Sequence, residues 1–201
     1  YTQMNDIEKE LKESIEVKQE LLAAGTATIK KMAGVMTDRL KAGNTVYLIG
    51  NGGSAADAQH IAGEMIGRFK KDRKALPVLA LTTDSSVITS IANDYGYDRC
   101  FERQIEAFVK KGDVVIGIST SGNSQGILRA VRLAKEKGAV TMGLTGRDGG
   151  SLKGLVDVCL QVPSGNTPRI QECHTTVGHI LCSIVEKELF GDSAPEEDKQ
   201  A

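Results

Sequence analysis

The sequence contains no tryptophan and few cysteines. Its four cysteines, Cys100, Cys159, Cys173 and Cys182, are scattered and form no CxxC pair. Such spacing favours free thiols in a reducing cytoplasm over a disulfide framework. No run of residues approaches the ~20 apolar positions of a membrane-spanning helix, and the first residues do not resemble a secretory signal. We therefore expect a cytoplasmic protein with no membrane partner.

The chain also lacks an excess of either charge. Lysine and arginine total 25, and aspartate and glutamate total 26. Nucleic-acid-binding domains usually carry a basic excess or a basic stripe, and neither is found here, so we expect no nucleic-acid partner. The length of 201 residues and the hydrophobic content of 40% suit a single well-buried domain.

Helical periodicity dominates the N-terminal region. Residues 7–22 place apolar side chains at mostly helical spacing among Glu and Lys, and a second helical stretch follows over residues 26–40. Gly25 separates the two stretches. We therefore predict a helical hairpin over residues 1–42, and its exposed apolar stripe indicates packing against an oligomer partner.

After residue 43 the pattern changes to short apolar runs that each lead into a helix. The five runs cover residues 45–49, 78–81, 114–118, 140–144 and 156–160. Continuous β-branched runs are typical of parallel strands buried on both faces. Residues 43–190 are thus predicted to form a three-layer α/β/α doubly wound domain with five parallel strands, its clearest helices at 124–137 and 169–190. Residues 191–201 are acidic and contain proline, so we expect a disordered tail.

Two loops follow predicted strands and precede predicted helices, where such sheets bind ligands. The first, residues 50–55, reads GNGGSA, and its glycines allow an anion to approach the backbone N–H groups of the next helix. A tight turn or a dinucleotide site would also fit, although Asp84 comes late for a ribose-binding acid. The second, residues 119–124, reads STSGNS, and its hydroxyls can surround a phosphate.

Four side chains are candidates for metal binding or proton transfer. His60 and Glu64 are four residues apart and share one helix face. Gln171 and His179 lie on the last helix, about 12 Å apart at ~1.5 Å rise per residue. They would meet by leaning together or by coming from neighbouring subunits. The set suits a divalent metal or an acid/base pair equally well, and His174 is expected to be structural.

Four motifs together resemble the sugar isomerase (SIS) domain family and, within it, the phosphoheptose isomerases. They are GNGGS at 50–54, STSGNS at 119–124, LTGRDGG at 144–150 and RIQE at 169–172. The resemblance implies a flavodoxin-like fold and conversion of sedoheptulose 7-phosphate to D-glycero-D-manno-heptose 7-phosphate through an enediol(ate). This is the first step toward heptose for lipopolysaccharide or another surface polysaccharide. It also implies a homotetramer with active sites at subunit interfaces, and a zinc ion.

The site residues implied by the resemblance follow its motifs. The metal ligands would be His60, Glu64, Gln171 and His179. The substrate would contact Asn51, Gly52, Gly53, Asn93, Asp94, Ser119, Thr120, Ser121, Ser124 and Gln171, with Ser54 and Arg68 bordering the pocket. Glu64 is assigned as the base and His179 as the acid, or the reverse. Pro168 stands where some relatives carry an aspartate, so a sugar-hydroxyl contact there is not implied.

Two other functions fit parts of the pattern. A non-catalytic SIS-domain regulator that binds the replication initiator protein keeps the serine loop and the RIQE string. It lacks the His/Glu pair and the late histidine, whereas this chain has His60, Glu64 and His179, which favours an enzyme. An isomerase of another sugar phosphate, such as an amino-hexose or pentose phosphate, would use the same loops.

Overall fold

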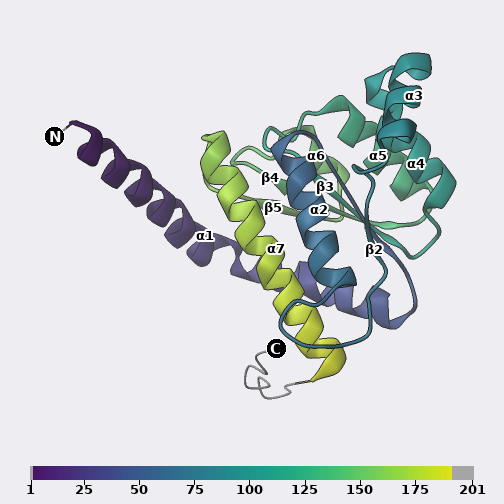
Figure 1. The fold of residues 1–201 in the computed structure, drawn as a ribbon, viewed down its shortest axis with the longest axis horizontal. Helices are drawn as coiled ribbons and strands as arrows, with labels where there is room; N and C mark the ends of the chain where they lie inside the picture. The colour runs from purple at the N-terminus through teal and green to yellow at the C-terminus, as the bar shows by residue number, and fades with distance from the viewer. Residues whose placement is uncertain (1, 192–201) are drawn as a thin grey trace, which may run out of the picture.

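The computed structural model describes residues 2–191 and confirms the three-layer α/β/α architecture (Figure 1). Five parallel strands form one sheet in the order β2-β1-β3-β4-β5, which is the flavodoxin-like doubly wound order. The strands are β1 (Val46–Gly50), β2 (Val78–Ala80), β3 (Val114–Ile118), β4 (Val140–Thr145) and β5 (Val158–Gln161). Each strand begins and ends within two residues of its expected position.

The helices cover both faces of this sheet. They are α1 (Thr2–Lys41), α2 (Gly53–Ile66), α3 (Ser85–Tyr95), the 3-10 helix η1 (Tyr97–Arg99), α4 (Cys100–Phe108), α5 (Gln125–Glu136), α6 (Gly150–Leu155) and α7 (Thr167–Phe190). Successive strand residues point to opposite faces, so Leu48 joins the buried cluster with α1, α2 and α7. Ile49 joins the cluster with α4, α5 and α6 on the other face. The sheet is therefore buried on both sides.

The predicted helical hairpin is wrong: residues 2–41 form one continuous helix of 40 residues. Glycine lowers helix propensity by about 1 kcal/mol but does not end a helix by itself. At Gly25 the missing side chain allows close packing, because an added Cβ would lie 2.7 Å from Leu21 Cδ1 and 3.3 Å from Leu160 Cδ1. The apolar contact of α1 with β5 therefore offsets the weak propensity. Figure 1 shows the N-terminal part of α1 projecting beyond the sheet.

Asp84 has a structural task in the connection after β2. Its carboxylate accepts a hydrogen bond of 3.0 Å from the Val87 backbone N–H and caps the N-terminus of α3. This residue was the nearest candidate for the ribose-binding acid of a dinucleotide site. Its capping role weighs against that alternative.

No helix within residues 2–191 has the combination of length and apolar character that crossing a bilayer requires. The expected tail, apart from Gly191, lies outside the described residues.

Candidate active site

The first loop turns directly from β1 into α2. An added Cβ at Gly50 would lie 2.5 Å from the Ser54 carbonyl oxygen, so only glycine allows this turn. Gly52 has a φ of 55°, a backbone conformation that residues other than glycine rarely adopt. The turn leaves Gly52 and Gly53 exposed at the start of α2. The backbone N–H groups there are open to an anionic ligand.

The second loop turns from β3 into α5. Within it, Ser119 Oγ accepts a hydrogen bond from the Gly122 N–H and Ser121 Oγ accepts one from the Asn123 N–H, both at 3.2 Å. Ser124 occupies the N-cap position of α5, but its side chain does not cap the helix. A hollow of about 300 Å³ lies beside the loop and is lined by Thr120, Ser121 and Asn123 together with residues that follow β4 and β5.

The two loops meet at the switch point of the sheet. The chain leaves β1 toward β2 on one side, while β3 pairs with β1 on the other. This reversal opens a crevice at the carboxyl ends of the strands. Asn51 Nδ2 donates a hydrogen bond of 2.8 Å to Ser124 Oγ. This hydrogen bond therefore connects the two loops that were predicted to bind phosphate.

Helices α2 and α7 run parallel and side by side from this crevice. An added Cβ at Gly53 would lie 2.5 Å from Gln171 Nε2, and Thr175 Oγ1 donates to Asp57 Oδ1 at 2.8 Å. Further along, Gly178 brings the helices close, because a Cβ there would lie 2.7 Å from Ile61 Cγ1. The close packing of α2 against α7 along their length brings together side chains that are distant in the sequence.

The same pairing places His60, Glu64 and His179 together. Their candidate ligand atoms all lie within 4.8 Å of one another. His60 Nε2 is 2.6 Å from His179 Nε2 and 3.7 Å from Glu64 Oε1. The Phe69 ring lies beside His179, with 5.6 Å between the ring centroids. The cluster is open enough for a ligand, since the side chain of His60 is 47% exposed and that of Glu64 is 25% exposed.

These three residues fit a divalent metal by the chemistry of their donors. Two imidazole nitrogens and a carboxylate are the ligands that zinc accepts, usually with a fourth position for water or substrate. The nitrogens of a tetrahedral site would lie about 3.3 Å apart at bond lengths of about 2.0–2.1 Å. The present 2.6 Å between His60 and His179 therefore requires a small rotation of one ring.

Gln171 is not part of this cluster in one chain. Its side chain lies against Gly53 at the start of α2, about 12 Å from His179 along α7 at ~1.5 Å per residue. Gln171 therefore borders the loop end of the crevice, and its role as a metal ligand stays a prediction.

Three other predicted substrate residues make no polar contact with the cluster or the loops. Arg68, Asn93 and Asp94 are exposed. The side-chain amide of Asn93 donates to Asp94 Oδ1 at 2.8 Å. Within residues 2–191, no hydrogen bond or ion pair links these three side chains to the two loops or the histidines. Their contact with substrate remains a prediction.

One residue that the sequence reasoning missed contacts the loops directly. Tyr97, from η1, donates a hydrogen bond of 2.9 Å from its hydroxyl to Asn51 Oδ1. It belongs to no recognisable motif, and no signal in its sequence neighbourhood indicated this contact.

His174 is structural, as expected. It is fully buried, and its Nε2 lies 3.2 Å from the Thr145 carbonyl oxygen at the end of β4. Burial lowers the pKa of His174 to about 4, and the hydrogen bond to Thr145 opposes this shift only in part. The ring is therefore neutral in the folded protein at neutral pH.

The depressed pKa of His174 makes folding stability depend on pH. The unfolded chain binds a proton at this residue near pH 6.5 and the folded chain only near pH 4. The free energy of unfolding should thus fall as the pH drops from 6.5 to 4, by up to about 3 kcal/mol. Denaturant titrations of wild type and His174→Gln across this range check the prediction. The difference between the two proteins should shrink at low pH, and a constant difference would contradict the assignment.

Comparison with known proteins agrees with this fold. The SIS domain model matches residues 11–146. The phosphoheptose isomerase of Clostridium acetobutylicum is 54% identical over 194 residues, which cover 96% of this chain and 99% of that protein. A structure of a phosphoheptose isomerase from Neisseria gonorrhoeae is 41% identical with a TM-score of 0.87, covering 92% of this chain and 98% of that one.

A second solved structure has the same fold over its whole length. The phosphoheptose isomerase from Francisella tularensis is 35% identical with a TM-score of 0.90 and covers 93% of this chain and 100% of that one. Fold, site and these similarities lead to one assignment: the chain belongs to the phosphoheptose isomerase family of SIS-domain proteins.

Proposed function

We propose that this protein is an aldose–ketose isomerase that converts sedoheptulose 7-phosphate to D-glycero-D-manno-heptose 7-phosphate. The observation that carries the proposal is the meeting of Glu64 and His179 on the two helices that lead from the joined loops, with their ligand atoms within 4.8 Å of each other. A relative that is 54% identical over nearly the whole chain is named phosphoheptose isomerase. The product is a heptose phosphate suited to the synthesis of lipopolysaccharide or another surface polysaccharide.

The phosphate group is bound at the loop end of the crevice. The hydroxyls of residues 119–124 and the N-termini of α2 and α5 provide donors for a dianion. From Gly53 to His60 the helix rises about 10 Å, a span comparable with an extended seven-carbon sugar. A phosphate held at the loops thus places the carbonyl end of the sugar near His60, Glu64 and His179. Binding of the remote phosphate positions the reacting carbons.

Glu64 and His179 then move the protons. Glu64 removes the proton from the carbon beside the carbonyl and returns it to the neighbouring carbon. His179 donates a proton to the carbonyl oxygen and accepts one from the adjacent hydroxyl, so that the enediol(ate) never carries its full charge. A carboxylate and an imidazole suit these roles near neutral pH. The opposite assignment of the two roles uses the same geometry.

His60, Glu64 and His179 would hold a zinc ion, with Gln171 as the fourth ligand once the assembly brings it close. Bound there, zinc would supply electrophilic stabilisation of the developing oxygen charge. His60, which lies 2.6 Å from His179, also fixes the orientation of the His179 ring.

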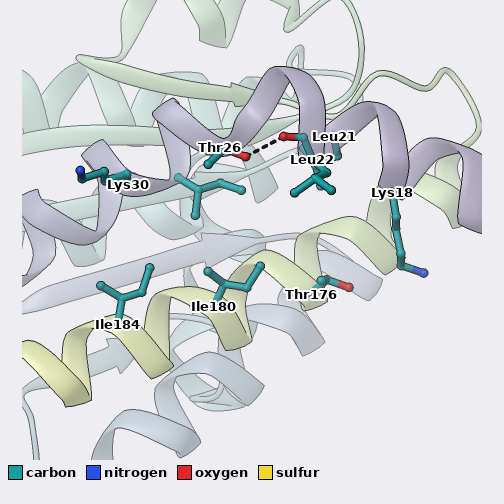
Figure 2. A pocket seen from close by; sticks show the side chains of 9 residues that line it. Lys18, Leu21, Leu22, Thr26, Lys30, Thr176, Ile180 and Ile184 are labelled. Carbon is teal, nitrogen blue, oxygen red and sulfur yellow. Dashed lines mark hydrogen bonds between the residues drawn. The ribbon is translucent and has the colours of Figure 1, made fainter. Parts of the chain in front are cut away.

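The active form is proposed to be a cytoplasmic homotetramer with active sites at subunit interfaces. An apolar groove of about 590 Å³ lies between α1 and α7 and is lined by Leu21 and Leu22 on one side and Ile180 and Ile184 on the other (Figure 2). A second hollow that includes His179 shares Ile180 and Ile184 with this groove. A neighbouring copy on this face would therefore bury apolar surface and close the site near His179.

Turnover measurements with the purified protein test this function. Sedoheptulose 7-phosphate should be converted to the aldose phosphate, whereas an amino-hexose 6-phosphate and a pentose 5-phosphate should react much more slowly. Incubation with a chelator should lower the rate, and added zinc should restore it. Absence of turnover under every metal condition would contradict the proposal and favour a regulatory role.

A further inference from the structure

Tyr97, Asn51 and Ser124 form a chain of hydrogen bonds across three separate elements. The Tyr97 hydroxyl donates to Asn51 Oδ1 at 2.9 Å, and Asn51 Nδ2 donates to Ser124 Oγ at 2.8 Å. An amide oxygen only accepts and an amide nitrogen only donates, so the direction of the chain is fixed. Ser124 Oγ accepts from Asn51, and its own hydrogen remains available to another acceptor.

Within residues 2–191 that hydrogen has no acceptor, because the one side-chain hydrogen bond of Ser124 is the one it accepts from Asn51. Ser124 is the N-cap residue of α5, and its Oγ also accepts no capping hydrogen bond from the first turn. From this chain we infer that Tyr97 is a positioning residue for the phosphate group of the substrate. It orients the Asn51 amide, which in turn holds Ser124 with its hydroxyl hydrogen free for a phosphate oxygen. This inference rests on the proposed function, because it takes the loop of residues 119–124 to bind phosphate.

Loss of the Tyr97 hydroxyl removes the preference between the two orientations of the Asn51 amide. After a half-turn of the amide, its oxygen faces Ser124, and the serine hydroxyl then donates to Asn51. The phosphate thereby loses one hydrogen bond although no residue that touches it has changed.

Tyr97 is half exposed, and contacts of neighbouring residues hold the segment that carries it against α5. The residue after it, Asp98, packs against Gly126 of α5, where an added Cβ would lie 3.6 Å from Asp98 Cα. Glu102, at the start of α4, accepts from Arg129 Nε of α5 at 3.2 Å. Partial burial, and to a lesser extent Cys100, raises the pKa of the Tyr97 phenol, so its hydroxyl keeps its proton at neutral pH and remains a donor.

Tyr97→Phe, which removes only this hydroxyl, tests the inference. The Kd for inorganic phosphate, measured by calorimetry, and the KM for sedoheptulose 7-phosphate should each rise roughly three- to tenfold, the effect of one hydrogen bond. The kcat should stay within about twofold. Tyr95→Phe is the matched control, because Tyr95 packs its ring on the Arg103 guanidinium at 4.9 Å and the change keeps the ring. It should leave both constants unaltered.

A double variant shows whether Tyr97 acts through Ser124. In a Ser124→Ala background, Tyr97→Phe should cause no further loss of phosphate affinity, whereas independent effects would multiply. Unchanged phosphate binding in Tyr97→Phe, multiplying effects, or wild-type protein that fails to bind phosphate would overturn the inference. If phosphate binding follows the expected pattern while wild type turns over no sugar phosphate, the proposed isomerase function fails and the inference stands.

Discussion

Glu64→Gln is expected to lower kcat by roughly 10²- to 10⁴-fold, the usual contribution of a general base. The amide keeps the size of the side chain but cannot accept the carbon-bound proton. Phosphate binding at the loops should change little, because Glu64 lies about 16 Å along α2 from Gly53 at ~1.5 Å rise per residue. Steady-state rates with sedoheptulose 7-phosphate, together with the phosphate Kd, measure the two effects separately.

Glu106→Gln provides the control for this variant. Glu106 is on the surface of α4, where its side chain is 60% exposed and pairs with Arg103. Its change to glutamine should leave kcat unaltered. If Glu64→Gln kept more than about a tenth of the wild-type kcat, a general-base role for Glu64 would be wrong.

Glu186→Gln is expected to lower the free energy of unfolding by about 3–5 kcal/mol, because it leaves the Arg73 charge buried without its counter-charge. The side chains of Arg73 and Glu186 are each 2% exposed, with 3.1 Å between Arg73 Nε and Glu186 Oε1. Glu186 also accepts hydrogen bonds from the backbone N–H groups of Phe69 and Lys70. Chemical denaturation at one fixed protein concentration measures the change, since oligomer assembly contributes to stability.

This ion pair also supports the site. Arg73 Nη2 donates to the Glu64 carbonyl oxygen at 2.9 Å, and Glu186 holds the segment that places Phe69 beside His179. Glu8→Gln, which breaks an exposed pair with Lys12, is the control and should cost less than about 1 kcal/mol. Equal effects of the two variants would show that burial does not strengthen the Arg73–Glu186 interaction.

The sheet could be predicted from the sequence because its signal is local. A run such as Val114–Ile118 is apolar at every position, and that pattern is typical of a strand covered on both faces. The continuity of α1 could not be predicted in the same way. Whether Gly25 ends a helix depends on Leu160, which lies across the interface in β5, and no spacing in the sequence reveals that contact.

The candidate site, too, could be predicted only where its signal is local in the sequence. The two loops were identified because glycines and serines stood between a strand and a helix. The motif resemblance implied that His60 and His179 share a site. Their meeting depends on the parallel packing of α2 and α7, which neither the motifs nor the periodicity predicted. Tyr97 was missed because one tyrosine beyond a helix end carries no signal until its hydroxyl is placed near Asn51. The separation of Gln171 from His179, by contrast, could be predicted, because both residues lie on α7 and the helical rise sets it.

A crystal structure of the Glu64→Gln variant with bound sedoheptulose 7-phosphate tests the account most directly. We expect the phosphate on residues 119–124, with the first two sugar carbons within about 3.5 Å of the side chains at positions 64 and 179. A sugar bound with these two carbons out of reach of either side chain, in the complete assembly, would contradict proton transfer by Glu64 and His179.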